Sequence, residues 1–183
     1  KKGGYVVVYE NGYVTNLKST CKIRVLKVTD SPITFDGKAL HYIMNTLPAV
    51  LAAYLFRDIS IEDIRTGLST FVPSPALTPG RLNMFEFKKC KFLADFAHNP
   101  AGLELLGDFV SKMDGSPKVG IISGTGDRRD EDIRELGRLS TKYFDEIIIR
   151  GDKNLRGCTA EELVNLLVEG INEAKTSDIP VEI

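Results

Sequence analysis

Val119-Gly-Ile-Ile-Ser123 is a short apolar run, and the polar glycine loop Gly124-Thr-Gly-Asp-Arg-Arg129 follows it directly. Apolar side chains then recur at helical spacing from Ile133 to Phe144, and Glu146–Arg150 is a second apolar run. Two short buried strands joined by an amphipathic helix are typical of neighbouring parallel strands with a crossover helix. This stretch therefore predicts a strand–loop–helix–strand unit at the centre of an α/β domain.

The same alternation continues on both sides of this unit. Strands are predicted over residues 82–87 and 91–97, and Asn99-Pro100 then has the cap and first-turn residues of a helix. Thr159-Ala-Glu-Glu162 has capping-box spacing before a last helix. We expect an α/β fold with a mostly parallel sheet and helices on both faces. Because ligands gather at the carboxyl ends of such strands, the loops 95–100, 123–130 and 150–158 are expected in one crevice.

Residues 1–79 have a different pattern and are expected to form a separate unit. Pro73, Pro75 and Pro79 interrupt regular structure just before residue 80, which indicates a linker or hinge. Alternating strand-like runs precede it, with Asn11-Gly12 as a hairpin turn. Helical runs follow over 38–56 and after Ser60-Ile-Glu-Asp63. The strand-like runs are Tyr5–Tyr9, Tyr13–Leu17 and Cys21–Val28. This small set predicts that residues 1–79 are the end of a larger α/β domain, and that 80–183 form the second domain.

Composition limits the classes of function. The 183 residues carry a net charge of −1, with +3 in residues 1–79 and −4 in residues 80–183, which excludes the basic footprint of a nucleic-acid binder. With 43% hydrophobic and 27% charged residues, a packed core is expected and disorder is not. Two histidines and three scattered cysteines suggest no metal site. No signal peptide or membrane span is apparent, so we expect a cytoplasmic protein. The chain opens at Lys1 without a methionine, and we expect a fragment of a longer protein.

Three sets of polar residues in and around the predicted loops and helices could carry chemistry. Asp95 and Asn99 lie where a strand turns into a helix, and a helix N-terminus favours phosphate or carboxylate. The alternative is that Asp95 bonds backbone N–H groups and Asn99 only caps the helix. His41 and Asn45 share one helix face, where satisfied polar residues of the core are the alternative. Arg81 follows the proline segment. Either it is an ordinary surface charge, or its side chain reaches into a cleft between the two predicted domains.

The loops after the two central strands could bind an amino acid or an anion. Gly124–Arg129 displays Arg128 and Arg129, either toward an anion or as an ordinary solvated loop. The loop Arg150–Arg156 mixes both charges, as a pocket for a zwitterion requires and as many surface loops do. As a dinucleotide fingerprint the glycine loop is weak, because Arg129 stands at its third glycine position.

Four motifs in their order along the chain resemble the Mur ligase superfamily. They are the helix with His41 and Asn45, then Pro79-Gly-Arg-Leu-Asn83, Asp95-Phe-Ala-His-Asn-Pro-Ala-Gly102 and Gly124-Thr-Gly-Asp-Arg-Arg-Asp-Glu-Asp132. Ile149-Arg150 and Leu155-Arg-Gly157 look most like the cyanophycin synthetase branch. The resemblance implies a C-terminal Rossmann-like domain preceded by the end of a central ATPase domain. It also implies an ATP-dependent amide ligase that acts through an acyl phosphate and adds arginine to aspartate side chains.

The resemblance also assigns roles to residues. Arg81 would act catalytically by contacting the ATP phosphates, Asp95 would hold the ribose, and Asn45 would lie near the adenine. His98 and Asn99 would shape the nucleotide end of the site. Asp152 as the partner of a substrate guanidinium is our own hypothesis. The residues expected to face the incoming amino acid are Gly126, Asp127, Arg128, Arg129, Arg150, Asp152 and Arg156.

The phosphate loop and the magnesium ligands of the superfamily have no counterpart in this sequence and would lie upstream of it. The expected partners are ATP, Mg²⁺ and an amino-acid or peptide substrate, with no metal ligand in this chain and no nucleic acid or membrane. A homo-oligomer of the full-length enzyme is compatible with the sequence. The fragment alone is expected to be inactive. The alternatives are a Mur or folylpolyglutamate ligase with another amine substrate, and a non-catalytic nucleotide-binding α/β module.

Overall fold

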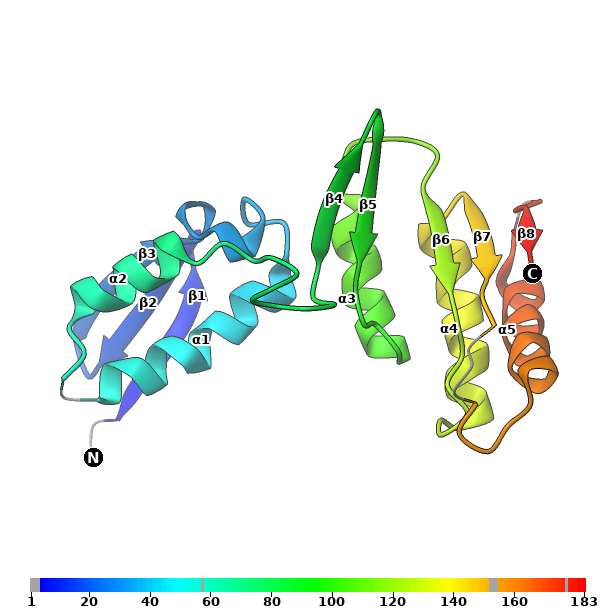
Figure 1. The fold of residues 1–183 in the computed structure, drawn as a ribbon. Helices are drawn as coiled ribbons and strands as arrows, with labels where there is room; N and C mark the ends of the chain where they lie inside the picture. Colours follow the sequence, from blue (N-terminus) through cyan, green and yellow to red (C-terminus); the bar gives the residue numbers. More distant parts are fainter. Residues whose placement is uncertain (1–3, 57, 152–154, 177) are drawn as a thin grey trace. The chain divides into compact units, whose positions relative to one another are not determined.

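The computed structural model describes residues 4–56, 58–151, 155–176 and 178–183 (Figure 1). Its internal contacts divide the chain into two compact units, Lys1–Ala94 and Asp95–Ile183. The division at 79/80 expected from the proline segment differs from this one by residues 80–94, a turn and one hairpin, and stays a prediction.

The first unit contains a three-stranded antiparallel sheet in the order β1 (Tyr5–Glu10), β2 (Tyr13–Lys18) and β3 (Cys21–Lys27). Asn11 and Gly12 both have positive φ, 50° and 79°, as a tight hairpin turn between right-twisted strands requires. The three predicted strands and this turn are confirmed.

Two helices cover one face of this sheet. After the short 3₁₀ turns η1 (Val28–Asp30) and η2 (Pro32–Thr34), α1 (Leu40–Leu55) continues through Pro48, and α2 (Ile61–Thr70) begins at the predicted capping box. Their apolar side chains join those of β2 and β3 in one buried cluster: Val14, Val25, Val28, Ile43, Val50 and Ile64. Arg65 of α2 also donates to the backbone carbonyls of Arg24 at 2.9 Å and Val25 at 2.8 Å, which ties the helix to the edge strand β3.

An antiparallel hairpin of β4 (Asn83–Phe87) and β5 (Cys90–Ala94) completes the first unit. The second strand was predicted to run to residue 97, but it ends at Ala94. Asp95 accepts a hydrogen bond from the backbone N–H of Ala97 at 2.9 Å, and such a turn competes with strand pairing. Among the described residues, β5 pairs with β4 and joins no parallel ladder, so the expected parallel role of this strand is wrong.

The second unit confirms the α/β fold class. Its elements are α3 (Pro100–Ser111), β6 (Val119–Ile122), α4 (Asp130–Tyr143), β7 (Glu146–Ile149), α5 (Ala160–Ala174) and β8 (Val181–Glu182). β6, β7 and β8 form a parallel sheet in that order, with Ile121 opposite Ile148. The two-residue strand β8 was not predicted, because its length is too short for a periodicity signal.

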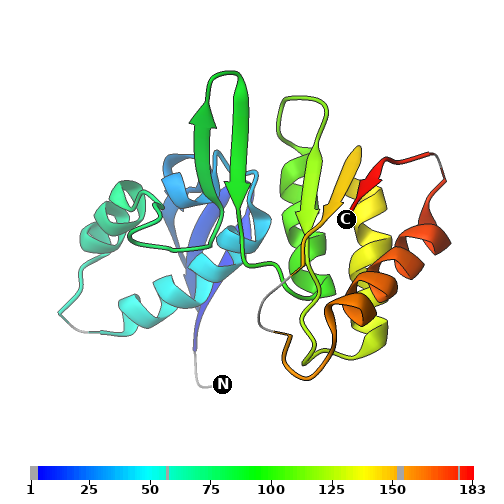
Figure 2. The same cartoon turned by 45° about the vertical axis from the view of Figure 1, so that its right-hand side comes forward.

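The helices of this unit pack on the sheet face that carries Ile147 and Ile149, which are 1% and 2% exposed (Figure 2). Leu163 and Leu167 of α5 and Ile133 of α4 belong to the same buried cluster. Helices were expected on both faces. In the part of the unit that the structure describes, the other face of β6 exposes Val119 to 44% and Ile121 to 67%. None of the helices formed by described residues is long and apolar enough to span a membrane.

Helices α4 and α5 touch through glycines. A Cβ on Gly170 would overlap the carbonyl of Arg134, and one on Gly137 would overlap the carbonyl of Leu167. The two helices therefore approach to backbone contact, closer than side chains would permit. Ion pairs of Arg134 with Glu169 and Arg138 with Glu173, 2.8 Å and 2.7 Å long, flank the contact.

Candidate functional site

The loops that follow β6 and β7 meet at the carboxyl end of the parallel sheet. Arg156 donates to the carboxylate of Asp127 at 2.5 Å, and the thiol of Cys158 lies 3.4 Å from the carbonyl oxygen of Gly126. These contacts join residues 126–127 to residues 156–158. The structure thus brings together two of the three loops predicted to form a crevice.

Gly126 is the residue that permits this contact. A Cβ at this position would overlap the carbonyl oxygen of Leu155 and stand 3.0 Å from the Cβ of Cys158. Any larger residue would push the two loops apart. The predicted role of Gly126 at the substrate site is untested, but its local role is to let the second loop close on the first.

The two adjacent arginines of the glycine loop differ. Arg129 stands at the N-cap of α4, and its guanidinium makes two hydrogen bonds to Asp132, at 3.0 Å and 2.7 Å. This hydrogen-bonded pair raises the pKa of Arg129 and lowers that of Asp132. Arg129 therefore stabilises the first turn of α4, with its side chain 83% exposed.

Arg128 has open hydrogen-bonding capacity instead. Its Nε is buried and has no hydrogen-bond partner among the described residues, and the nearest carboxylate, that of Asp127, is 4.0 Å away. The hydroxyl of Thr125 is also buried and has no hydrogen-bond partner among the described residues. Buried donors without partners cost free energy, so this loop has two groups that a bound anion would satisfy.

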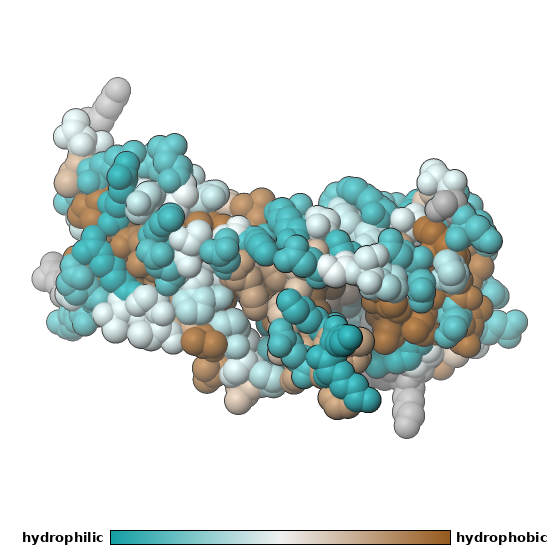
Figure 3. Space-filling view, turned by 90° about the horizontal axis from the view of Figure 1, so that it is seen from above, coloured by the Kyte–Doolittle hydropathy of each residue, from teal (hydrophilic) through white to brown (hydrophobic). Residues whose placement is uncertain are grey.

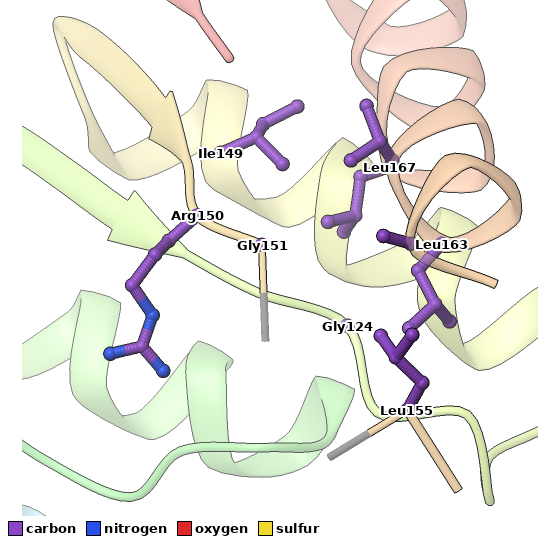
Figure 4. Close-up of a pocket in the computed structure, with 9 residues that line it drawn as sticks. Gly124, Ile149, Arg150, Gly151, Leu155, Leu163 and Leu167 are labelled. Carbon is purple, nitrogen blue, oxygen red and sulfur yellow. The ribbon is translucent and has the colours of Figure 1, made fainter. Parts of the chain in front are cut away.

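A small cavity lies beneath the two loops, lined by Gly124, Ile149, Arg150, Gly151, Leu155, Ala160, Leu163, Val164 and Leu167 (Figure 4). Its volume is about 10 Å³, which is room for about one water molecule. The guanidinium of Arg150 points away from the leucines that line it (Figure 4). This cavity is too small for an amino acid. Asp152, the hypothetical partner of a substrate guanidinium, lies outside the described residues.

The turn between β5 and α3 is held by its own side chains. Besides the Asp95 contact, Asn99 caps α3 by accepting the N–H of Gly102 at 2.7 Å. Nδ1 of His98 lies 3.0 Å from the carbonyl of Phe96, and a carbonyl only accepts, so the proton of a neutral imidazole belongs on Nδ1 and Nε2 is left as an acceptor. The local alternative for Asp95 and Asn99 is thus present, and their nucleotide role stays a prediction.

In the first unit, Asn45 is exposed on α1, and the ring of His41 lies tilted against that of Tyr42 with centroids 4.6 Å apart. Arg81 lies in a turn closed by Asn83, whose side-chain oxygen accepts the N–H of Gly80 at 2.7 Å and whose amide donates to Thr78 at 3.0 Å. Asn83 is 4% exposed, and sequence reasoning missed it as a positioning residue. The signal was an asparagine three residues after a glycine in a proline-rich turn.

No group of three or more histidine, cysteine, aspartate or glutamate side chains in the described ranges could hold a metal ion. Among the carboxylates near the glycine loop, those of Asp127 and Asp132 are each engaged by an arginine. The residues that the structure describes around this loop therefore do not form a magnesium site.

Comparison with known proteins identifies the family. Residues 80–180 match the family described as Mur ligase, glutamate ligase domain. The chain is 41% identical over 175 residues to a cyanophycin synthetase of Nostoc sp., covering 96% of this chain and 19% of that protein. It is 27% identical over 150 residues to a UDP-N-acetylmuramoyl-L-alanyl-D-glutamate–2,6-diaminopimelate ligase of Aquifex aeolicus, covering 77% of this chain and 30% of that protein.

The fold is shared with a solved structure. Folylpolyglutamate synthase of Mycobacterium tuberculosis, complexed with ADP and AMPPCP, superimposes with a TM-score of 0.64 at 17% identity, covering 97% of this chain and 38% of that one. The chain spans about a fifth of the length of the cyanophycin synthetases that it matches. The match of residues 80–180, together with the fold and the ordered motifs, shows that this chain belongs to the Mur ligase family and is similar to the C-terminal part of cyanophycin synthetases.

Proposed function

We propose that this chain is part of a longer ATP-dependent amide ligase that joins arginine to the side-chain carboxylate of aspartate. The observation that carries the proposal is the 41% identity to a cyanophycin synthetase over 96% of the chain. In this reaction a substrate carboxylate attacks the γ-phosphate of ATP, which releases ADP and forms an acyl phosphate. The amine of arginine then attacks the acyl carbon, forming the amide and releasing phosphate.

The contact between Asp127 and Arg156 suits an amino acid that bears both charges. Arginine would exchange this ion pair for two others, its guanidinium with the Asp127 carboxylate and its own carboxylate with the Arg156 guanidinium. Both charges of the pair then keep a partner throughout binding. Gly126 and Arg150 belong to the same proposed substrate site, and so does Asp152 as a second partner for the guanidinium.

Arg128 is the proposed contact for the reacting anion. Its unpartnered Nε and the Thr125 hydroxyl would satisfy oxygens of a carboxylate or acyl phosphate as charge develops there. Arg129 makes two hydrogen bonds to Asp132, and its proposed role is to stabilise the start of α4 and not to contact the ligand. The structure thus supports a division of the two arginines that the sequence could not make.

The nucleotide is proposed to contact Asp95 through its ribose, Asn45 near its base and Arg81 at its phosphates, with His98 and Asn99 at one end. The nucleotide complex of the folylpolyglutamate synthase of similar fold supports a nucleotide in this family. The described residues offer no magnesium site, so no step here is assigned to the metal, and the chain alone is expected to be inactive.

The proposal is tested on the full-length protein that contains this chain. Phosphate release is measured with ATP, an aspartate-containing peptide and one of four amines: arginine, lysine, glutamate or diaminopimelate. We expect release with arginine and the amide product by mass spectrometry. Release with another amine and not with arginine would replace the proposal by the Mur or folylpolyglutamate alternative. Nucleotide binding without release for any amine would favour a non-catalytic module.

The site is tested with two matched variants of the full-length protein, Arg156→Gln and Arg129→Gln. Both remove one guanidinium from a pair with an aspartate. We expect Arg156→Gln to raise the KM for arginine at least about tenfold, since a charged hydrogen bond of the bound substrate is lost. Arg129→Gln should change it far less, and equal effects of the two would contradict the assignment.

A further inference from the structure

A second hollow lies at the opposite edge of the parallel sheet, where β6, β7 and β8 begin. Its volume is about 520 Å³, within the range of about 300–1,000 Å³ typical of small-molecule sites. Figure 3 shows the molecule from above, the side on which β6 begins, with hydrophilic and hydrophobic residues both on the surface. The lining residues are Ser111, Gly115, Ser116, Lys118, Thr141, Lys142, Tyr143, Phe144, Asp145, Asp178 and Ile179. None of them belongs to the site described above.

Two aromatic rings wall this hollow, and glycines make room for both. A Cβ on Gly107 of α3 would overlap the ring of Tyr143, and a Cβ on Gly120 of β6 would overlap the ring of Phe144. Both rings are half-buried. Their positions are therefore set by the packing of α3 and β6, and they offer a prepared apolar wall.

Charges of both signs stand around these rings. Lys118 and Lys142 supply two ammonium groups, and Asp145 and Asp178 supply two carboxylates. Asp145 also accepts the backbone N–H of Lys118 at 2.7 Å, which fixes it in place. The last turns of α3 and α4 end here, and the carbonyls at a helix C-terminus favour a cation.

Lys142 is held at the aromatic wall. Its ammonium lies 4.8 Å from the ring centroid of Tyr143, and the hydrogen bond to the Tyr143 side chain raises the pKa of Lys142. Lys118 reaches the carbonyl of Ser111 at 3.5 Å. The cations thus line the α3 and α4 sides of the hollow, while Asp178 lies before β8.

We propose that this hollow binds a guanidinium-bearing zwitterion, either free arginine or an arginine residue carried on a peptide. A planar guanidinium stacks on aromatic rings and pairs with carboxylates, here Tyr143 or Phe144 with Asp178 and Asp145. The carboxylate of the same ligand pairs with Lys118 or Lys142. The lining of the hollow carries this proposal independently of the proposed ligase activity.

The test is titration of the ¹⁵N-labelled 183-residue chain followed by NMR. The probes are L-arginine, citrulline, which has the same shape without the charge, agmatine, which lacks the carboxylate, and a dipeptide of aspartate with arginine on its side chain. We expect arginine to shift the amide signals of Gly115, Lys118, Tyr143 and Phe144 with saturation. Citrulline and agmatine should each bind at least about tenfold more weakly. A stronger effect of the dipeptide than of arginine identifies the peptide-borne source, and the reverse identifies free arginine.

Two variants separate this hollow from the carboxyl edge. Asp178→Asn removes an exposed carboxylate of the hollow, and Asp127→Asn removes one from the opposite edge. We expect Asp178→Asn to weaken the shifts at the hollow at least about fivefold and Asp127→Asn to leave them unchanged. Shifts confined to residues 124–129 and 155–158 would overturn this inference, as would equal binding of citrulline. If arginine shifts the signals of the hollow but not those of residues 124–129, this inference stands and the proposed substrate site at the carboxyl edge is contradicted.

Discussion

Arg156 donates a hydrogen bond to Asp127 at 2.5 Å, although 29 residues separate the two in the sequence. The contact is the charged link between the loops at the carboxyl end of the sheet. We expect Arg156→Gln to speed amide hydrogen exchange at residues 125–128, because the loop loses its partner. The guanidinium of Arg129 bonds Asp132 in the first turn of α4, so Arg129→Gln should instead affect exchange at residues 130–133. Slower or unchanged exchange at 125–128 in Arg156→Gln would contradict the link.

The same pair predicts a pH dependence. The hydrogen bond from Arg156 lowers the pKa of Asp127 from its ordinary value, and this outweighs the raising effect of burial. The folded state then favours the charged carboxylate, so the pair contributes stability above the ordinary aspartate pKa of about 3.9. That stability is lost as pH falls through the lowered pKa. An NMR pH titration of the carboxyl carbon should show a lowered midpoint in the parent chain and a higher one in Arg156→Gln. In Arg129→Gln the Asp132 midpoint should rise instead.

Two glycine-to-alanine changes should have opposite signs. Gly170→Ala places a Cβ against the Arg134 backbone, and overpacking of this kind costs about 1–3 kcal/mol of unfolding free energy. Gly67→Ala lies on the exposed face of α2 with nothing within 4 Å, and alanine there gains about 0.5–1 kcal/mol from helix propensity. Urea denaturation followed by circular dichroism measures both. Stabilisation by Gly170→Ala would mean that α4 and α5 are not in backbone contact.

Asn16 predicts a stabilising core substitution. It is 2% exposed, and neither its side-chain nitrogen nor its oxygen has a hydrogen-bond partner among the described residues. Asn16→Val removes these unpaired groups from a strand that favours β-branched residues, and should raise the unfolding free energy by about 1–3 kcal/mol. Thr34→Val is the control. Its hydroxyl bonds the carbonyls of Val28 and Ser31 at 2.6 Å and 2.9 Å, so this change should destabilise the chain. A loss of stability in Asn16→Val would show that the amide has a partner, such as a buried water.

Asn83 sets the turn that carries Arg81. Asn83→Ala leaves the N–H of Gly80 without its partner and removes one of two donors to the carbonyl of Thr78, the other being the N–H of Arg81. It should destabilise the chain by about 1–3 kcal/mol. Asn83→Asp keeps the acceptor for Gly80 but turns a buried carboxylate toward the carbonyl oxygens of Thr78 and Arg81, so it should destabilise the chain at least as much. Hydrogen exchange at Gly80 and Arg81 measures the turn directly. Equal exchange in the parent chain and Asn83→Ala would remove Asn83 as a positioning residue.

Local signals predicted the elements well, because they act within a few residues. The capping boxes at Ser60 and Thr159 and the cap at Asn99 begin helices where the sequence placed them. The strand before Asp95 ended three residues early, since the side chain of Asp95 bonds the backbone in place of a neighbouring strand. Whether that strand pairs in parallel or in a hairpin depends on partners distant in sequence, which a periodicity pattern does not contain.

The candidate site was predicted at the level of loops and not of side chains. The pattern placed Asp127 and Arg156 near strand ends, but their ion pair depends on how the two loops fold against each other. Arg128 and Arg129 are identical in type and adjacent, so only the three-dimensional placement of Asp132 distinguishes them. Asn83 was quoted within a motif yet not as a positioning residue, because its role is to bond backbone atoms that any residue possesses.

Helix α4 begins at the glycine loop and ends at the hollow. It is 14 residues long, about 20 Å, and it is wedged against α5 by the glycine contact at its middle. Because this contact leaves little room for either helix to shift at its middle, α4 behaves as one rigid element. Arg129 at the start of α4 and Tyr143 at its end are therefore held by the same rigid helix, one beside each of the two proposed sites. The close approach of these two glycine-bearing backbones thus fixes side chains at both edges of the sheet together.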